Sequence, residues 1–153
     1  MMFSYSAMEN PYEDFLSKVS LTGQLTSGGE NMSAADHLGT YAEGWTKGDA
    51  NTILKAVSDE YTFDDPNVGK IAKGGFAEYL AGMKETVRSL QGGNLPDPFM
   101  ALTEVVTREE EGVLTAWCWW TVPGTEIQGS GLIKVGAEGV RSEVITYYAK
   151  LPA

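Results

Sequence analysis

A change of pattern near residue 99 constrains the fold of this chain more than any other feature. Before it, apolar residues recur at the spacing of buried helix faces, and capping residues separate the runs. After it, four runs with the composition of strands span roughly 100–110, 113–122, 127–136 and 139–149, with short turn sequences between them. Helices followed by an antiparallel meander predict an α+β domain.

Within the stretch from residue 33 to this change, three helices and one strand are predicted. Ser33 can cap the first helix, and Gly48 ends it. Asp49 can cap a short second helix, and a third is expected over about 76–90. A strand over about 60–65 lies between the second and third helices. The apolar face of the first helix consists of Leu38, Tyr41, Ala42 and Trp45.

The length and composition suit one domain with an N-terminal extension. With 153 residues and 42% hydrophobic content, the chain can form a single core. Residues 20–32 show little periodicity, and a short helix is expected before them over about 11–19. We therefore predict an N-terminal helical arm and linker over residues 1–32 and a folded domain over residues 33–153.

Charge and cysteine content exclude several functions. Eleven Lys and Arg against 21 Asp and Glu give a formal charge of −10, so we expect neither nucleic acid nor membranes as partners. Cys118 and His37 are the only residues of their types, which argues against a disulfide or a cysteine/histidine metal cluster. Gly74-Gly75 lacks the spacing of a phosphate loop, and we expect no cofactor. Without a long apolar run or a signal peptide, the chain is expected to be soluble and cytoplasmic.

Asp65 is the strongest candidate for an acid–base group. Alternation along its strand places Tyr61, Phe63 and Asp65 on one face and Asp64 on the other. A carboxylate turned into an apolar interior loses hydration and so favours accepting a proton. The alternative is a turn, Asp65-Pro66-Asn67, in which the aspartate accepts backbone hydrogen bonds.

Three features together resemble the ketosteroid isomerase pattern of the nuclear transport factor 2-like superfamily: Tyr41 on the first helix, the break at Gly48-Asp49, and the pair Asp65-Pro66. This superfamily also includes SnoaL-type polyketide cyclases, limonene epoxide hydrolases and scytalone dehydratases. The resemblance covers about residues 33–150. It implies a cone-shaped α+β barrel, in which three helices pack in a strongly curved, mostly antiparallel sheet. Ser130 stands near the position of a second, protonated aspartic acid in the isomerases.

The resemblance also implies roles for individual residues. Asp65 would be the proton-shuttling base, and Tyr41 would donate a hydrogen bond to an oxyanion. The alternative for Tyr41 is a core tyrosine bonded to another side chain. Glu143 is expected at the rim of the pocket or paired with Arg141 or Lys134. The residues expected to bind substrate are His37, Trp45, Tyr61, Phe63, Met83, Cys118, Trp120, Ile145 and Tyr147.

Two tryptophans are expected on the outer face of the sheet. In the strand over 113–122, alternation and the isomerase alignment turn Cys118 and Trp120 inward and Trp117 and Trp119 outward. Two exposed indoles favour an association surface. We therefore expect a homodimer formed through this face.

The sequence predicts a cofactor-independent enzyme that acts by proton transfer on a small apolar substrate, as an isomerase, a lyase or dehydratase, or a cyclase. Its 16 aromatic residues favour an aromatic or polycyclic ligand. The alternative is a non-catalytic small-molecule-binding or assembly module that uses the same pocket. Epoxide hydrolysis ranks lower, because no Asp-Arg-Asp set is apparent.

Overall fold

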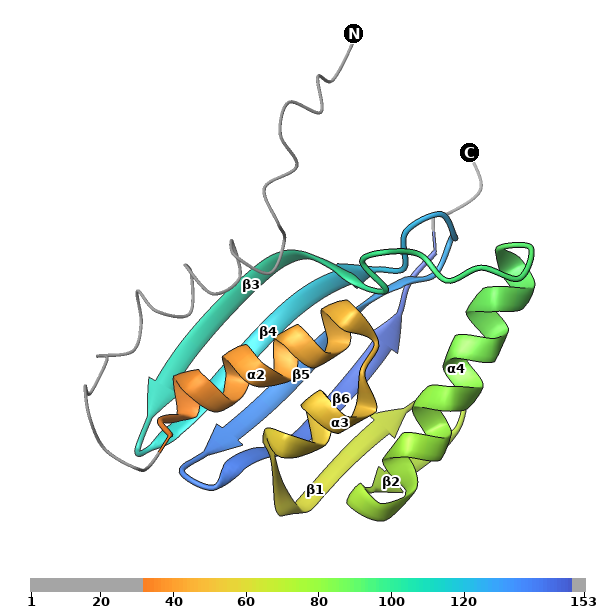
Figure 1. The fold of residues 1–153 in the computed structure, drawn as a ribbon. Helices are drawn as coiled ribbons and strands as arrows, with labels where there is room; N and C mark the ends of the chain where they lie inside the picture. The colour runs from red at the N-terminus through yellow and green to blue at the C-terminus, as the bar shows by residue number, and fades with distance from the viewer. Residues whose placement is uncertain (1–31, 150–153) are drawn as a thin grey trace, which may run out of the picture.

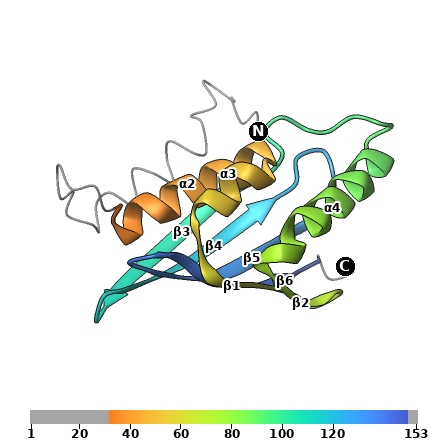
Figure 2. The same cartoon turned by 60° about the horizontal axis from the view of Figure 1, so that its bottom comes forward.

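One sheet and three helices make up the described part of the protein, a computed structural model that covers residues 32–149. The helices α2, α3 and α4 all lie on one face of the sheet (Figures 1 and 2). This arrangement agrees with the predicted α+β class. Residues 1–31 of the arm and linker predicted over 1–32 lie outside the described residues.

Helix α2 begins and ends, and helix α3 begins, where their capping residues predict. Helix α2 spans Ala34–Lys47, and its N-cap Ser33 exchanges hydrogen bonds with Asp36 in a capping box. Gly48 closes the helix in the left-handed conformation, with φ 66°. Asp49 then caps α3, Ala50–Lys55, by accepting a hydrogen bond from the backbone N–H of Asn51 at 3.0 Å.

The segment between the first strand and the third helix contains a strand that the sequence analysis missed. Strand β2, Gly69–Ala72, pairs antiparallel with β1, Val57–Asp65. It is a short edge strand with a mostly exposed surface, so no alternation of apolar and polar residues marks it. A single 3-10 turn, Lys73–Gly75, leads into α4, Phe76–Leu90.

The sheet has six strands in the order β2-β1-β6-β5-β4-β3. All neighbours pair antiparallel except β1 and β6, which run parallel, so the sheet is mixed but mostly antiparallel as predicted. The parallel pairing brings the ends of β1 and β6 to the same end of the sheet. The remaining strands are β3 Ala101–Glu110, β4 Val113–Thr121, β5 Gln128–Gly136 and β6 Gly139–Tyr147.

Aromatic rings fill the space between the helices and the inner face of the sheet. Phe76 of α4 is fully buried and packs edge-on against Trp45 of α2 and Tyr61 of β1, with ring centroids 5.7 Å apart in both pairs. The ring centroid of Phe63 lies 5.5 Å from that of Trp45 and 5.2 Å from that of Tyr79. These contacts join α2, α4 and β1 across the core. Within the described residues, no helix is both long and apolar enough to cross a membrane.

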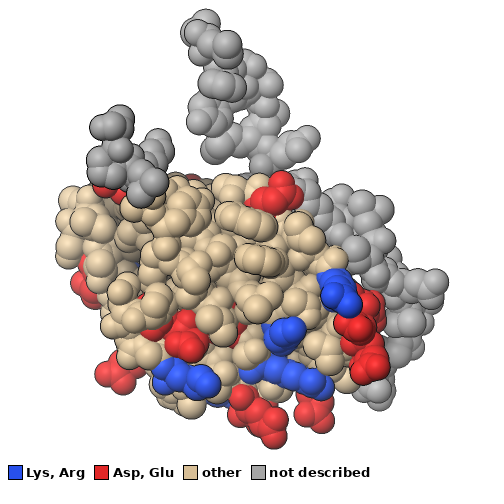
Figure 3. Space-filling model, turned by 180° about the vertical axis from the view of Figure 1, so that it is seen from behind, with Lys and Arg blue, Asp and Glu red and all other residues tan. Residues whose placement is uncertain are grey.

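The outer face of the sheet carries a continuous apolar row. Strand register places Val106, Trp117, Leu132 and Val144 directly opposite one another across β3, β4, β5 and β6. Their exposed fractions are 58%, 51%, 37% and 46%. Trp119 stacks on Trp117 with centroids 5.6 Å apart. Figure 3 shows this side of the molecule, where uncharged side chains cover a broad area and charged ones gather toward one end. We call these five residues the outer apolar row.

A close helix crossing provides a test of this packing. A Cβ atom at Gly44 of α2 would overlap the side chain of Ile53 and lie 2.7 Å from its backbone nitrogen in α3. We therefore expect Gly44→Ala to lower the free energy of unfolding by about 1–3 kcal/mol. The matched control is Gly82→Ala in α4, where no atom lies within 4 Å, and it should raise stability by about 0.5–1 kcal/mol. Urea denaturation measures both values, and equal effects of the two substitutions would contradict the packing described.

Candidate active site

A wide cavity opens between α4 and the ends of β1 and β6. Its volume is about 770 Å³, and its wall is largely apolar. Asp65 at the end of β1 and Tyr147 at the end of β6 line one side, while α4 forms the other. We call it the outer cavity. Its lining includes Asp65, Ile71, Tyr79, Met83, Trp120, Val122, Ile127 and Tyr147.

Asp65 is buried in the wall of the outer cavity and accepts hydrogen bonds on both oxygens. Tyr79 and Tyr147 donate their hydroxyls to Oδ2 at 2.6 and 2.8 Å, and the backbone N–H of Asn67 donates to Oδ1 at 2.9 Å. Burial, together with the neighbouring carboxylate, raises the pKa of both tyrosines well above the ordinary value. Both hydroxyls therefore stay protonated and act as donors.

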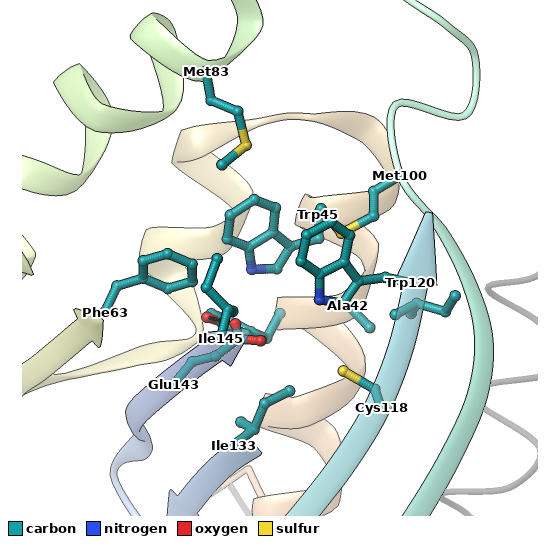
Figure 4. Close-up of a pocket in the computed structure, with 12 residues that line it drawn as sticks. Ala42, Trp45, Phe63, Met83, Met100, Cys118, Trp120, Ile133, Glu143 and Ile145 are labelled. Atoms are coloured by element: carbon teal, nitrogen blue, oxygen red, sulfur yellow. Dashed lines mark hydrogen bonds between the residues drawn. The ribbon is translucent and has the colours of Figure 1, made fainter. Parts of the chain in front are cut away.

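A second and much smaller space lies deeper, between α2 and the inner face of β4, β5 and β6 (Figure 4). Its volume is about 20 Å³, enough for about one water molecule. We call it the inner chamber. Met83 and Trp120 line both this chamber and the outer cavity. The lining consists of Tyr41, Ala42, Trp45, Phe63, Met83, Met100, Leu102, Cys118, Trp120, Ile133, Glu143 and Ile145.

Glu143 on β6 holds the polar end of the inner chamber. It is only 4% exposed, and Tyr41 donates its hydroxyl to Oε1 at 2.5 Å. The hydroxyls of Tyr41 and Tyr61 lie 2.7 Å apart. Because the single proton of Tyr41 goes to Glu143, Tyr61 must be the donor in the second bond. The three groups form one chain of hydrogen bonds, from Tyr61 through Tyr41 to the carboxyl.

Burial dominates the electrostatics of this chain. Loss of hydration raises the pKa of Glu143 to about 7, even though the hydrogen bond from Tyr41 acts in the opposite direction. Burial first, and the adjacent carboxyl second, also raise the pKa of Tyr41 and Tyr61. A glycine makes room for the carboxyl, since a Cβ atom at Gly131 of β5 would collide with Oε2 of Glu143.

The structure separates the predicted catalytic pair. Asp65 lines the outer cavity, whereas Tyr41 lines the inner chamber and is bonded to other side chains. The two alternatives considered for these residues both occur, since Tyr41 is a bonded core tyrosine and Asp65 accepts the backbone N–H of its own turn. The prediction for Glu143 was wrong: the carboxyl is buried and bonded to Tyr41, neither at the rim nor paired with a basic side chain.

Seven of the nine expected substrate-binding residues line one of the two spaces. His37 and Tyr61 line neither. The Nε2 atom of His37 lies 3.2 Å from the carbonyl oxygen of Ala137, in the turn before β6. The start of α2 therefore packs at the end of the sheet opposite to the outer cavity. Tyr61 is buried behind Tyr41. The others are Trp45, Phe63, Met83, Cys118, Trp120, Ile145 and Tyr147.

Sequence reasoning missed two members of the site. Glu143 lies two residues before Ile145 and four before Tyr147, both of which face inward, so strand alternation alone could have placed it inside. Tyr79 lies on α4, and no local sequence signal links it to Asp65, which is 14 residues away. Burial raises the pKa of the Cys118 thiol, which fits an inert core residue. Among the residues that the structure describes, no group of three His, Cys, Asp or Glu side chains could hold a metal ion.

Solved structures share this fold, although no protein-family model and no curated protein matches the chain. A candidate polyketide cyclase from Xanthomonas campestris pv. campestris is 15% identical with a TM-score of 0.54, covering 75% of this chain and 90% of its own. An NTF2-like protein of unknown function from Cytophaga hutchinsonii ATCC 33406 is 15% identical with a TM-score of 0.53, and the match covers 79% of this chain and 95% of that protein. TerC, co-crystallized with polyporic acid, is 14% identical with a TM-score of 0.56, and the match covers 75% of this chain and 91% of TerC.

These similarities define the class of structure. The chain has the nuclear transport factor 2-like fold, in which three helices pack against a curved, unclosed sheet. This confirms, at the level of the fold, the resemblance inferred from Tyr41, Gly48-Asp49 and Asp65-Pro66.

The buried Glu143 carboxyl should make stability depend on pH. Its pKa rises from 4.5 to about 7, so between these values the folded chain keeps a proton that the unfolded chain has released. Stability therefore falls as the pH rises through this window, by about 3 kcal/mol at roughly 1.4 kcal/mol per pH unit. The glutamine in Glu143→Gln does not titrate, so the variant should not lose stability in this window. Its free energy of unfolding minus that of the wild type should therefore increase by about 3 kcal/mol between pH 4 and pH 8.

Urea denaturation at a series of pH values measures this difference. Glu138→Gln, at an exposed turn position, controls for the removal of one negative charge and should follow the wild-type profile. Parallel profiles for the wild type and Glu143→Gln would show that the carboxyl titrates as it does in water.

Proposed function

We propose that the protein is a cofactor-independent enzyme that transfers a proton on a small, largely apolar substrate with an aromatic or polycyclic skeleton. The observation that carries the proposal is a buried carboxylate, Asp65, held by two tyrosine hydroxyls in the wall of a large apolar cavity. Carboxylate and hydroxyl groups together supply the base and the hydrogen-bond donor that such a reaction needs.

In the proposed reaction, Asp65 removes a proton from a carbon next to a carbonyl group. The electron pair of the broken C–H bond moves toward the carbonyl oxygen and forms an enolate. A hydroxyl of Tyr79 or Tyr147, freed when Asp65 takes up the proton, donates a hydrogen bond to that oxygen. Return of the proton to a different carbon completes an isomerisation. In a cyclisation, the enolate carbon attacks a second carbonyl within the substrate, the π bond of that carbonyl breaks, and the resulting alkoxide takes the proton back from Asp65.

The assignment changes the donor that the sequence predicted. Tyr41 donates to Glu143 in the inner chamber, so the tyrosines beside Asp65 take its place as donors in the outer cavity. Two neighbours support a small organic ligand, one as a candidate polyketide cyclase and the other by its co-crystallized polyporic acid.

A non-catalytic binding module is the second candidate, and one observation favours it. Both oxygens of Asp65 already accept hydrogen bonds from the protein, which is also what a purely structural carboxylate would do. In that case Asp65→Asn would leave ligand affinity nearly unchanged, and no turnover would accompany binding.

The proton transfer can be measured directly by exchange. Aromatic ketones are first screened for binding by thermal shift, with β-tetralone as the first probe, and loss of their α-protons in heavy water is then followed by proton NMR. We expect catalysed exchange in the wild type and a loss of about 10²–10⁴-fold in Asp65→Asn. The matched control is Asp64→Asn, since Asp64 precedes it on the same strand and faces the other side. Equal exchange rates in the two variants would contradict a catalytic role for Asp65.

We also propose that the protein forms a homodimer through the outer apolar row. Exposed apolar area of this kind is unusual on a monomer and is typical of protein interfaces. The double substitution Trp117→Lys, Trp119→Lys should therefore halve the mass measured by sedimentation. Leu90→Lys, at an exposed apolar position of α4, serves as the control and should leave the mass unchanged. A monomeric wild type, or a dimer that survives the double substitution, would contradict this interface.

A further inference from the structure

The inner chamber contains a hydrogen-bond donor that the protein does not use. Trp45 of α2 is 5% exposed and lines the chamber, and its Nε1 has no hydrogen-bond partner among the described residues. Burial of an unpaired N–H group is unfavourable, and most such groups in folded proteins are paired. A ligand atom that accepts a hydrogen bond would satisfy it.

The same chamber also offers an acceptor. Tyr41 occupies Oε1 of Glu143, while Oε2 lies over Gly131, where the missing side chain leaves it room. The rest of the wall is almost entirely apolar, and Figure 4 shows the Glu143 carboxyl and the Trp45 indole at the same space. A bound group is therefore offered one donor and one acceptor.

The size of the chamber restricts what can enter it. About 20 Å³ holds a single oxygen atom with its hydrogen, whereas an aromatic ring needs several times that space. Met83 and Trp120 form a wall common to the chamber and the outer cavity. The unbranched side chain of Met83 can change rotamer readily, so the end of a ligand in the outer cavity can reach the chamber past it.

We propose that the inner chamber binds one hydroxyl group, phenolic or enolic, at the end of a planar apolar ligand whose rings lie in the outer cavity. The hydroxyl oxygen accepts the N–H of Trp45, and its proton is donated to Oε2 of Glu143. A carbonyl oxygen could satisfy only the donor, and a plain hydrocarbon neither. This inference rests on the aromatic ligand class of the proposed function and adds the group by which the ligand is recognised.

Two ligands that differ by one hydroxyl test the subsite. Dissociation constants of para-phenylphenol and biphenyl are measured on the full chain by fluorescence titration at pH 8. We expect the wild type to prefer the phenol by about tenfold, the effect of one hydrogen bond to a charged group. Trp45→Phe and Glu143→Leu should each lose most of that preference, while Trp117→Phe on the outer face should keep it.

The possible results separate this inference from the proposed function. If biphenyl binds and the hydroxyl adds nothing in the wild type, the subsite is wrong while the aromatic ligand class stands. If neither compound binds, the ligand class is wrong, and the subsite with it. A preference that survives both chamber substitutions would place the hydroxyl elsewhere. The wild-type comparison requires no variant to fold, and circular dichroism of each variant checks its structure.

Discussion

A carboxyl group buried in an apolar interior is the constraint around which this structure is organised. Glu143 is buried away from bulk water, where an unpaired carboxyl is unfavourable. Tyr41 of α2 donates a hydrogen bond to it, and Tyr61 of β1 is bonded to Tyr41 in turn. Gly131 must leave the space that the carboxyl occupies. One polar group thereby fixes the positions of a helix and three neighbouring strands, which packing of apolar side chains alone would set less sharply.

Two carboxylates in one core experience different environments. Asp65 receives three hydrogen bonds and lies beside the large cavity, whereas Glu143 receives one and faces a space the size of a water molecule. Enzymes commonly assign different tasks to carboxyl groups by this kind of contrast. Here it separates a group suited to proton transfer on a bulky substrate from one suited to recognition of a single small group.

Much of the fold could be predicted because its signals are local. Ser33, Gly48 and Asp49 mark helix boundaries, and alternation gave the correct face of Asp65. The inward face of Trp120 was predicted by alternation together with the isomerase resemblance. The site was harder, because its partners are distant in sequence. Tyr41 and Glu143 are 102 residues apart, and the usual exposure of carboxylates outweighed the parity that pointed inward. The edge strand β2 has no apolar face and so left no pattern to read.

The parallel pairing of β1 with β6 has a consequence for synthesis of the chain. Asp65 can accept the hydrogen bond from Tyr147 only when the chain has been made to 82 residues beyond it, and Tyr41 likewise depends on Glu143. Both partners belong to the last strand of the sheet, so neither carboxylate cluster can form on a nascent chain until that strand has left the ribosome. Contacts between residues so distant in sequence form slowly, because loop-closure entropy opposes them. Competence to bind a ligand in either space thus arises in one step, together with completion of the domain.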